Sequence, residues 1–186
     1  MRTRSVISRL QGGMRRFVAD RRGVSAVEFA MIAPLMITLY LGGVEVTQGV
    51  SVSRKTTLVA RTVADLVAQD TNVTNADMND ILSASAAVAS PYTTSNLKVT
   101  VSSVTIDSSG KATVAWSDSL NGTARSVGSA VTLNSALAIP NSSLIWGEVT
   151  YNYKPMFGWV LTGTFNLGDM IYMRPRNSNF ITRSAS

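Results

Sequence analysis

An apolar segment, Val24–Val44, directly follows a strongly basic stretch at the N-terminus of this 186-residue chain. The segment has 21 residues and a single charged side chain, Glu28. With a rise of about 1.5 Å per residue, a helix of this length crosses the roughly 30 Å hydrocarbon core of a bilayer. A buried core helix is the alternative, and it fits poorly with the arginines beside the segment. The sequence therefore predicts a transmembrane helix over residues 24–45.

The net charge of +6 is confined to the N-terminus. Residues 1–23 contain seven arginines and one aspartate, whereas residues 24–186 contain ten basic and ten acidic side chains. A nucleic-acid-binding domain would spread its basic residues over a folded surface, so no nucleic-acid partner is expected. Basic residues flank membrane helices on the cytoplasmic side, so residues 1–23 are predicted to be cytoplasmic and the chain after Glu45 to lie beyond the membrane.

Histidine and cysteine are both absent from the chain. Their absence excludes Ser-His-Asp and Cys-His nucleophilic sites and nearly all zinc, haem and iron–sulfur ligand sets. The carboxylates after residue 70 are scattered; Asp77 and Asp80 are neighbours, but at the start of a predicted helix, where acidic side chains are favoured. We expect no enzyme, no catalytic residue, no metal and no cofactor; a carboxylate hydrolase would need two of these groups to converge in a cleft.

Three fates of the N-terminus are open. An ordinary signal peptide would be cut after the apolar segment, but the residues after Val44 contain no convincing small-x-small site. An uncut leader would leave a signal-anchored periplasmic binding protein or adhesin. Cleavage after Gly23 would leave the helix on the mature protein. Within residues 1–23, a basic amphipathic helix on the membrane surface and a disordered tail both remain open, as does a start at Met1 or Met14.

Glu28 distinguishes these alternatives. A carboxylate at the centre of a membrane helix costs about 2.5–3.5 kcal/mol on insertion scales. Because Glu28 is about one turn from Val24, its side chain could reach the interface. Cleavage after Gly23 would instead give Val24 a free α-amine, which is cationic at neutral pH. Glu28, the fifth residue of that mature chain, could then pair with the amine of a neighbouring subunit.

The stretch RRGVSAVEFA at Arg21–Ala30, followed by Pro34 and by Gly42–Glu45, resembles the N-terminal signature of TadE-like proteins. These are minor pseudopilins of the tight-adherence (Tad/Flp) type IV pilus system. The resemblance implies that prepilin peptidase cuts between Gly23 and Val24, and that Glu28, followed by Phe29, is required for processing and assembly. Glu45 matches a second family glutamate; an interfacial carboxylate is the simpler interpretation of this residue.

The resemblance also implies partners and a location. The partners are prepilin peptidase, other pseudopilins and pilin subunits, the inner-membrane assembly platform and the lipid bilayer. The protein would be a single-pass protein of the bacterial inner membrane with a cytoplasmic N-terminus and a periplasmic head, with incorporation into the extracellular pilus as a further option. Phe29, where major pilins usually have tyrosine, and the large head argue against the major subunit. Residues 151–157 and 172–176 resemble the ends of such domains more weakly.

The remaining sequence predicts an α+β head at residues 70–186, after an amphipathic helix extension over residues 46–69. The apolar face of that extension consists of Val52, Val59, Val63, Leu66 and Val67. A second helix is expected from Thr74, with Asp77 completing a capping box and Asn75 as a rival cap, to about Val88.

Alternating apolar residues then predict about four antiparallel strands. The first has a change of phase at Ser102–Ser103 that indicates a bulge, and Asp107–Gly110 is a hairpin loop. The expected strands are 97–106, 112–116, 145–153 and 159–167, with a short one at 170–173. The tryptophans are expected in the core. The fold class is thus α+β and pilin-like, with a long N-terminal helix and a small antiparallel sheet.

Overall fold

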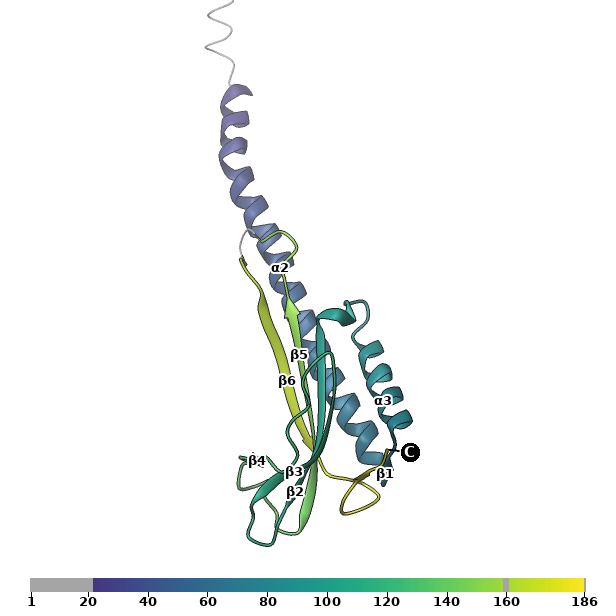
Figure 1. The fold of residues 1–186 in the computed structure, drawn as a ribbon. Helices are drawn as coiled ribbons and strands as arrows, with labels where there is room; N and C mark the ends of the chain where they lie inside the picture. Colours follow the sequence, from purple (N-terminus) through teal and green to yellow (C-terminus); the bar gives the residue numbers. More distant parts are fainter. Residues whose placement is uncertain (1–21, 159–160, 186) are drawn as a thin grey trace, which may run out of the picture. The chain divides into compact units, whose positions relative to one another are not determined.

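The computed structural model of the chain describes residues 22–158 and 161–185 (Figure 1). The leader motifs before Arg22 and the tryptophan at position 159 lie outside these residues. Helix α2 (Arg22–Gln69) has 48 residues and includes Pro34, which confirms the predicted long N-terminal helix. The chain divides into two compact units, with the boundary between Val44 and Glu45.

The second unit contains a five-stranded antiparallel sheet in the order β4-β3-β2-β5-β6. Its strands are β2 (Leu97–Ile106), β3 (Ala112–Leu120), β4 (Ala130–Val131), β5 (Ser142–Tyr153) and β6 (Phe165–Met173). Helix α3 (Asn75–Val88) and the short 3-10 helix η1 (Thr94–Asn96) precede the sheet. The predicted α+β class, a long helix followed by an antiparallel sheet, is confirmed.

A parallel pair of two-residue strands, β1 (Asn72–Val73) and β7 (Thr182–Arg183), joins the C-terminal segment to the end of α2. This pair was not predicted, because two residues are too few to show a period and the paired residues are more than a hundred positions apart in the sequence. Thr74 caps α3 through a complete capping box with Asp77, as predicted, and Asn75 is the first helical residue.

The main core lies between one face of the sheet and the two helices. The predicted apolar face of α2 contributes to this core, although Leu66 is only partly buried. The sheet contributes alternate residues of β2 and β5. Figure 1 shows α3 beside the C-terminal part of α2. The fully buried valines and the isoleucine of this core are Val52, Val59, Val63, Val67, Val73, Val99, Val101 and Ile145.

A second, smaller core lies on the opposite face of the sheet and contains Val104, Ile106, Ala112, Leu144 and Trp146. The change of phase in β2 therefore reflects apolar residues that pass from one face to the other. The predicted bulge is present at this point, but its extra residue is on β3: Ser103 pairs with Trp116 and Val104 pairs with Val114, which leaves Ala115 unmatched. Both described tryptophans are buried, as expected.

The two strands predicted at 159–167 and 170–173 are a single strand, β6, which spans Phe165–Met173 without a break, so the predicted division and the predicted start are wrong. It pairs continuously with β5, from Phe165 opposite Tyr153 to Met173 opposite Ile145. Residues 161–164, directly before it, form a loop in which Gly163 has φ +97°. These residues of the predicted strand therefore do not pair with the sheet.

The hairpin loop at Asp107 should make stability sensitive to acid. Asp107 Oδ1 accepts hydrogen bonds from the Ser109 hydroxyl (2.7 Å) and from the N–H groups of Lys111 (3.0 Å) and Ser109 (2.8 Å). These bonds, that of the hydroxyl first, lower the pKa of Asp107 in the folded state. A lowered folded pKa gives stability that is present above the unfolded pKa of about 3.9 and is lost as pH falls further.

We therefore expect Asp107→Asn to lose less stability than the unsubstituted protein between about pH 5 and pH 2. Asparagine can keep the turn but does not titrate in this range. Urea unfolding at the two ends of that range measures the difference. Equal losses in both proteins would contradict the assignment.

Candidate functional site

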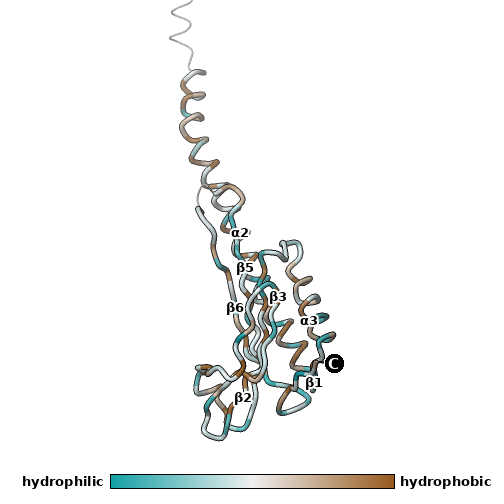
Figure 2. Tube along the Cα trace, viewed as in Figure 1, coloured by the Kyte–Doolittle hydropathy of each residue, from teal (hydrophilic) through white to brown (hydrophobic). Residues whose placement is uncertain are grey.

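The N-terminal part of α2 has apolar side chains on all sides. It belongs to the one helix, among the residues that the structure describes, that is long and apolar enough to cross a membrane. Its most apolar window has a mean hydropathy of 1.8 and is not buried at all, and Figure 2 shows hydrophobic residues recurring along it. The exposed large side chains are Val24, Val27, Phe29, Met31, Ile32, Leu35, Met36, Ile37, Leu39 and Tyr40. A helix that is apolar all round suits a membrane rather than water.

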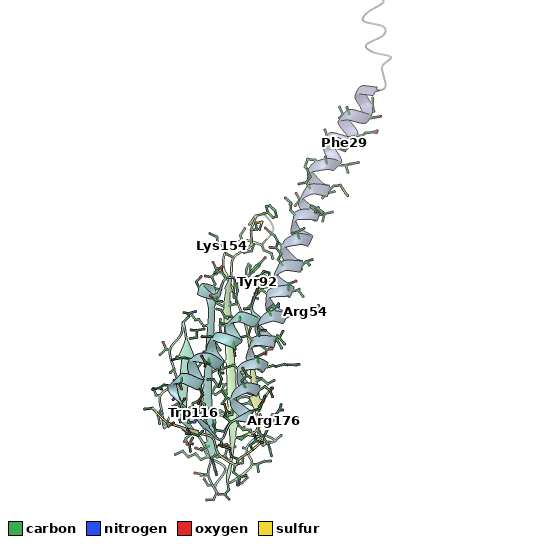
Figure 3. All side chains as sticks on the ribbon, turned by 90° about the vertical axis from the view of Figure 1, so that its right-hand side faces the viewer. Phe29, Arg54, Tyr92, Trp116, Lys154 and Arg176 are labelled. Carbon is green, nitrogen blue, oxygen red and sulfur yellow. The ribbon has the colours of Figure 1, made fainter. Side chains whose placement is uncertain are left out.

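The residues of the expected processing site lie on the first turns of this helix. Gly23, Val24, Glu28 and Phe29 are all exposed, and Phe29, labelled in Figure 3, has 73% of its surface accessible. A Cβ built on Gly23 would meet no atom within 4 Å. Among the side chains that the structure describes, none is a hydrogen-bond or ion-pair partner of Glu28. The arrangement leaves this carboxylate accessible to another molecule.

Glu45 has a different environment at the start of the second unit. Its side chain is completely buried. Oε1 accepts a hydrogen bond from Gly158 N–H at 2.6 Å, and Oε2 accepts one from Leu161 N–H at 3.0 Å. Two backbone donors offset the cost of removing a carboxylate from water. The sequence favoured an interfacial carboxylate here; the structure adds that Glu45 holds the backbone at Gly158 and Leu161, an interaction that we call the Glu45 clamp.

Tyr153, the last residue of β5, strengthens this clamp. Its hydroxyl donates a hydrogen bond to the backbone carbonyl oxygen of Glu45 at 3.2 Å. Its ring lies against Gly49, where a built Cβ would be 3.6 Å from Cε1. Burial, and then the negative charge of Glu45, raise the pKa of Tyr153, so the hydroxyl stays protonated as the donor. The end of β5 and the following segment are thus attached to the same turn of α2.

Glu45→Gln should loosen the segment at Gly158 and Leu161. Glutamine keeps one oxygen, but its NH₂ group would face the second backbone N–H, so one charge-assisted hydrogen bond is lost. We expect a loss of about 1–2 kcal/mol in the free energy of unfolding. Hydrogen exchange of the Gly158 and Leu161 amides should become faster. Glu148→Gln, a half-buried carboxylate in the same unit, is the matched control and should leave both amides unchanged.

The sequence could not show this clamp, because its two donors are backbone amides and carry no residue signature. The one local signal is Gly158, which has φ +65°, in the left-handed region that favours glycine. The family resemblance singled out Glu45 without indicating its partner.

Five other carboxylates of the second unit have partners within it. Asp118 pairs with Arg183, and Asp65 with Arg176. Glu148 forms a bidentate pair with Arg125, whose guanidinium lies 3.7 Å from the ring centre of Trp146. Asp77 and Asp107 serve the helix cap and the hairpin loop described above. The described residues contain no group of three side chains that could hold a metal ion.

Comparison with known proteins identifies one segment of the chain. Residues 23–65 match the family model of TadE-like proteins. The resemblance recognised in the sequence is thereby confirmed over the apolar helix and its extension. The weaker resemblances at 151–157 and 172–176 lie outside the matched residues. No curated protein and no solved structure matches the chain.

Proposed function

We propose that this chain, a TadE-like protein associated with a Tad pilus, is a minor pseudopilin that prepilin peptidase processes and that takes part in pilus assembly or initiation for surface adherence. TadE-like pilus proteins are structural rather than enzymatic. In this proposal Gly23 is the recognition residue of the peptidase, Val24 becomes the new N-terminus, and Glu28 and Phe29 serve processing and assembly.

One observation carries the proposal: the matched residues 23–65 begin with an apolar helical segment whose large side chains are exposed and in which Glu28 is the only charge. Such a helix needs a membrane or other apolar helices around it. In a bundle of subunits, Glu28 would be removed from water and would require a cation. The α-amine of Val24 on a neighbouring subunit provides one after cleavage.

The second candidate is a signal-anchored periplasmic binding protein or adhesin that keeps residues 1–23. It shares the single-pass topology, with the N-terminus in the cytoplasm and the head in the periplasm. It does not require Glu28, prepilin peptidase, other pseudopilins or an assembly platform. The mature N-terminus therefore separates the two functions.

Intact-mass measurement of the membrane-extracted protein tests the proposal. We expect the mass of residues 24–186 when prepilin peptidase is present and the full-length mass when it is absent. Full-length protein under both conditions would indicate the anchored binding protein. A chain that begins beyond Glu45 would show that the apolar segment is an ordinary signal peptide.

Gly23→Val should block cleavage, and the full-length mass should persist in the presence of the peptidase. A Cβ at this position meets no atom within 4 Å, and the residue is exposed, so a failure to cleave reports on recognition rather than on folding. Gly43→Val is the matched control, because a Cβ there is equally free of contacts and the residue is at the other end of the apolar segment. Efficient cleavage of Gly23→Val would exclude the proposed site.

A further inference from the structure

The segment Lys154–Gly158 that follows β5 exposes apolar side chains close to the Glu45 clamp. Met156 is 72% exposed and Phe157 is 43% exposed, while Pro155 is buried. Among the described residues after Glu45, these are the only two large apolar side chains that are exposed at consecutive positions. Lys154, which also faces solvent, is labelled at the end of β5 in Figure 3.

The clamp attaches this segment to the residue that directly follows the apolar segment. Glu45 is the residue directly after the apolar segment Val24–Val44, and one helical residue advances by about 1.5 Å. Its carboxylate holds the N–H of Gly158 at 2.6 Å, so the backbone beside Phe157 is tied to the first residue beyond the apolar segment. The Tyr153 hydroxyl also donates a hydrogen bond to the backbone carbonyl oxygen of Glu45.

We propose that Lys154–Gly158 is a membrane-surface site, in which Met156 and Phe157 enter the outer boundary of the lipid layer and the Lys154 ammonium lies among anionic head groups. The inference rests on the proposed insertion of residues 24–44 in the bilayer. Apolar and aromatic side chains beside a cationic one are the combination that binds the interfacial zone of a membrane.

Continuity with the apolar helix favours lipid over a protein partner. A segment held at the residue where the membrane helix leaves the hydrocarbon has the interface beside it whenever the helix is inserted. A protein partner would have to occupy that zone as well. Other exposed apolar side chains in the second unit, such as Val127 and Met170, occur singly and lack this link to Glu45.

The chain has no cysteine, which allows a direct test with single-cysteine variants of the full chain. Met156→Cys and Phe157→Cys are labelled with a polarity-sensitive fluorophore. Each protein is placed in phosphatidylethanolamine–phosphatidylglycerol vesicles at low protein-to-lipid ratio, with spin labels on the lipids at shallow or deep positions. Val127→Cys, a 71% exposed apolar side chain elsewhere in the second unit, is the matched control, and Leu39→Cys reports insertion of the helix.

We expect shallow spin labels to quench the probes at 156 and 157 severalfold more than the probe at 127, and deep labels to quench the probe at 39. A quenched probe at 39 with unquenched probes at 156 and 157 overturns the membrane-surface site and leaves the membrane anchor standing. An unquenched probe at 39 overturns both. A shift of emission to shorter wavelength without lipid quenching also overturns the site, in favour of a protein contact.

Discussion

Glu28→Gln is expected to leave the protein in the membrane and to abolish its contribution to pilus assembly. The substitution removes the only charge of the apolar segment, so the cost of inserting the helix falls, by up to about 2.5–3.5 kcal/mol. It also removes the group that the proposed pairing requires, because a neutral amide cannot form an ion pair with the Val24 amine of a neighbouring subunit. If the protein were only a signal-anchored binding protein, both membrane insertion and function would be unchanged or improved in this variant.

Pilus assembly is scored in cells that carry the variant as their only copy, and membrane association is measured by resistance to alkaline extraction. Asp65→Asn is the matched control: it makes the same change on the same helix but outside the apolar segment, where Asp65 pairs with Arg176. Intact mass separates the role of Glu28 in processing from its role in assembly. A variant that is cleaved normally but does not support pilus assembly has lost only the assembly role. Normal pili with Glu28→Gln would refute the assembly role of this carboxylate.

The sequence predicted the elements whose signals are local. The helix over Arg22–Gln69 follows from a long apolar run joined to an amphipathic one, and the start of α3 follows from a capping box that spans four residues. The turn at Asp107 is equally local. In each case the residues that determine the structure are within one or two turns of each other, so periodicity and capping suffice.

Features that depend on distant partners were missed or misplaced. The parallel pairing of β1 with β7 and the bulge on β3 are set by the segments across from them. Residues 161–164 were predicted to be part of a strand, but they form a loop, and the Glu45 carboxylate accepts hydrogen bonds from the N–H groups of Gly158 and Leu161. A side chain that binds backbone donors more than a hundred residues away leaves no pattern in the sequence around it.

Gly147 of β5 is where the contact between the sheet and α2 leaves no room for a side chain. A Cβ built there would lie 2.7 Å from the backbone oxygen of Ala60 and 3.2 Å from both Ala64 Cβ and Val63 Cγ1. The first of these atoms belongs to the helix backbone and cannot rotate away. Glycine weakens a strand, so its presence in the middle of β5 is explained by this close approach.

Gly147→Val should therefore separate the helix from the sheet, although valine is the better strand residue. Overpacking against a backbone atom is expected to cost about 3 kcal/mol in the free energy of unfolding, which lowers Tm by roughly 10 °C in a domain of this size. Gly147→Ala adds the Cβ alone and should cost less. Thr150→Val, on the other face of the same strand, is the control for β-propensity.

Because the Glu45 clamp and the core valines of α2 depend on the same packing, amide exchange should rise at Gly158 as well as along β5. An unchanged Tm for Gly147→Val would mean that the helix can move away from the sheet at little cost, and that the sheet does not fix where α2 lies.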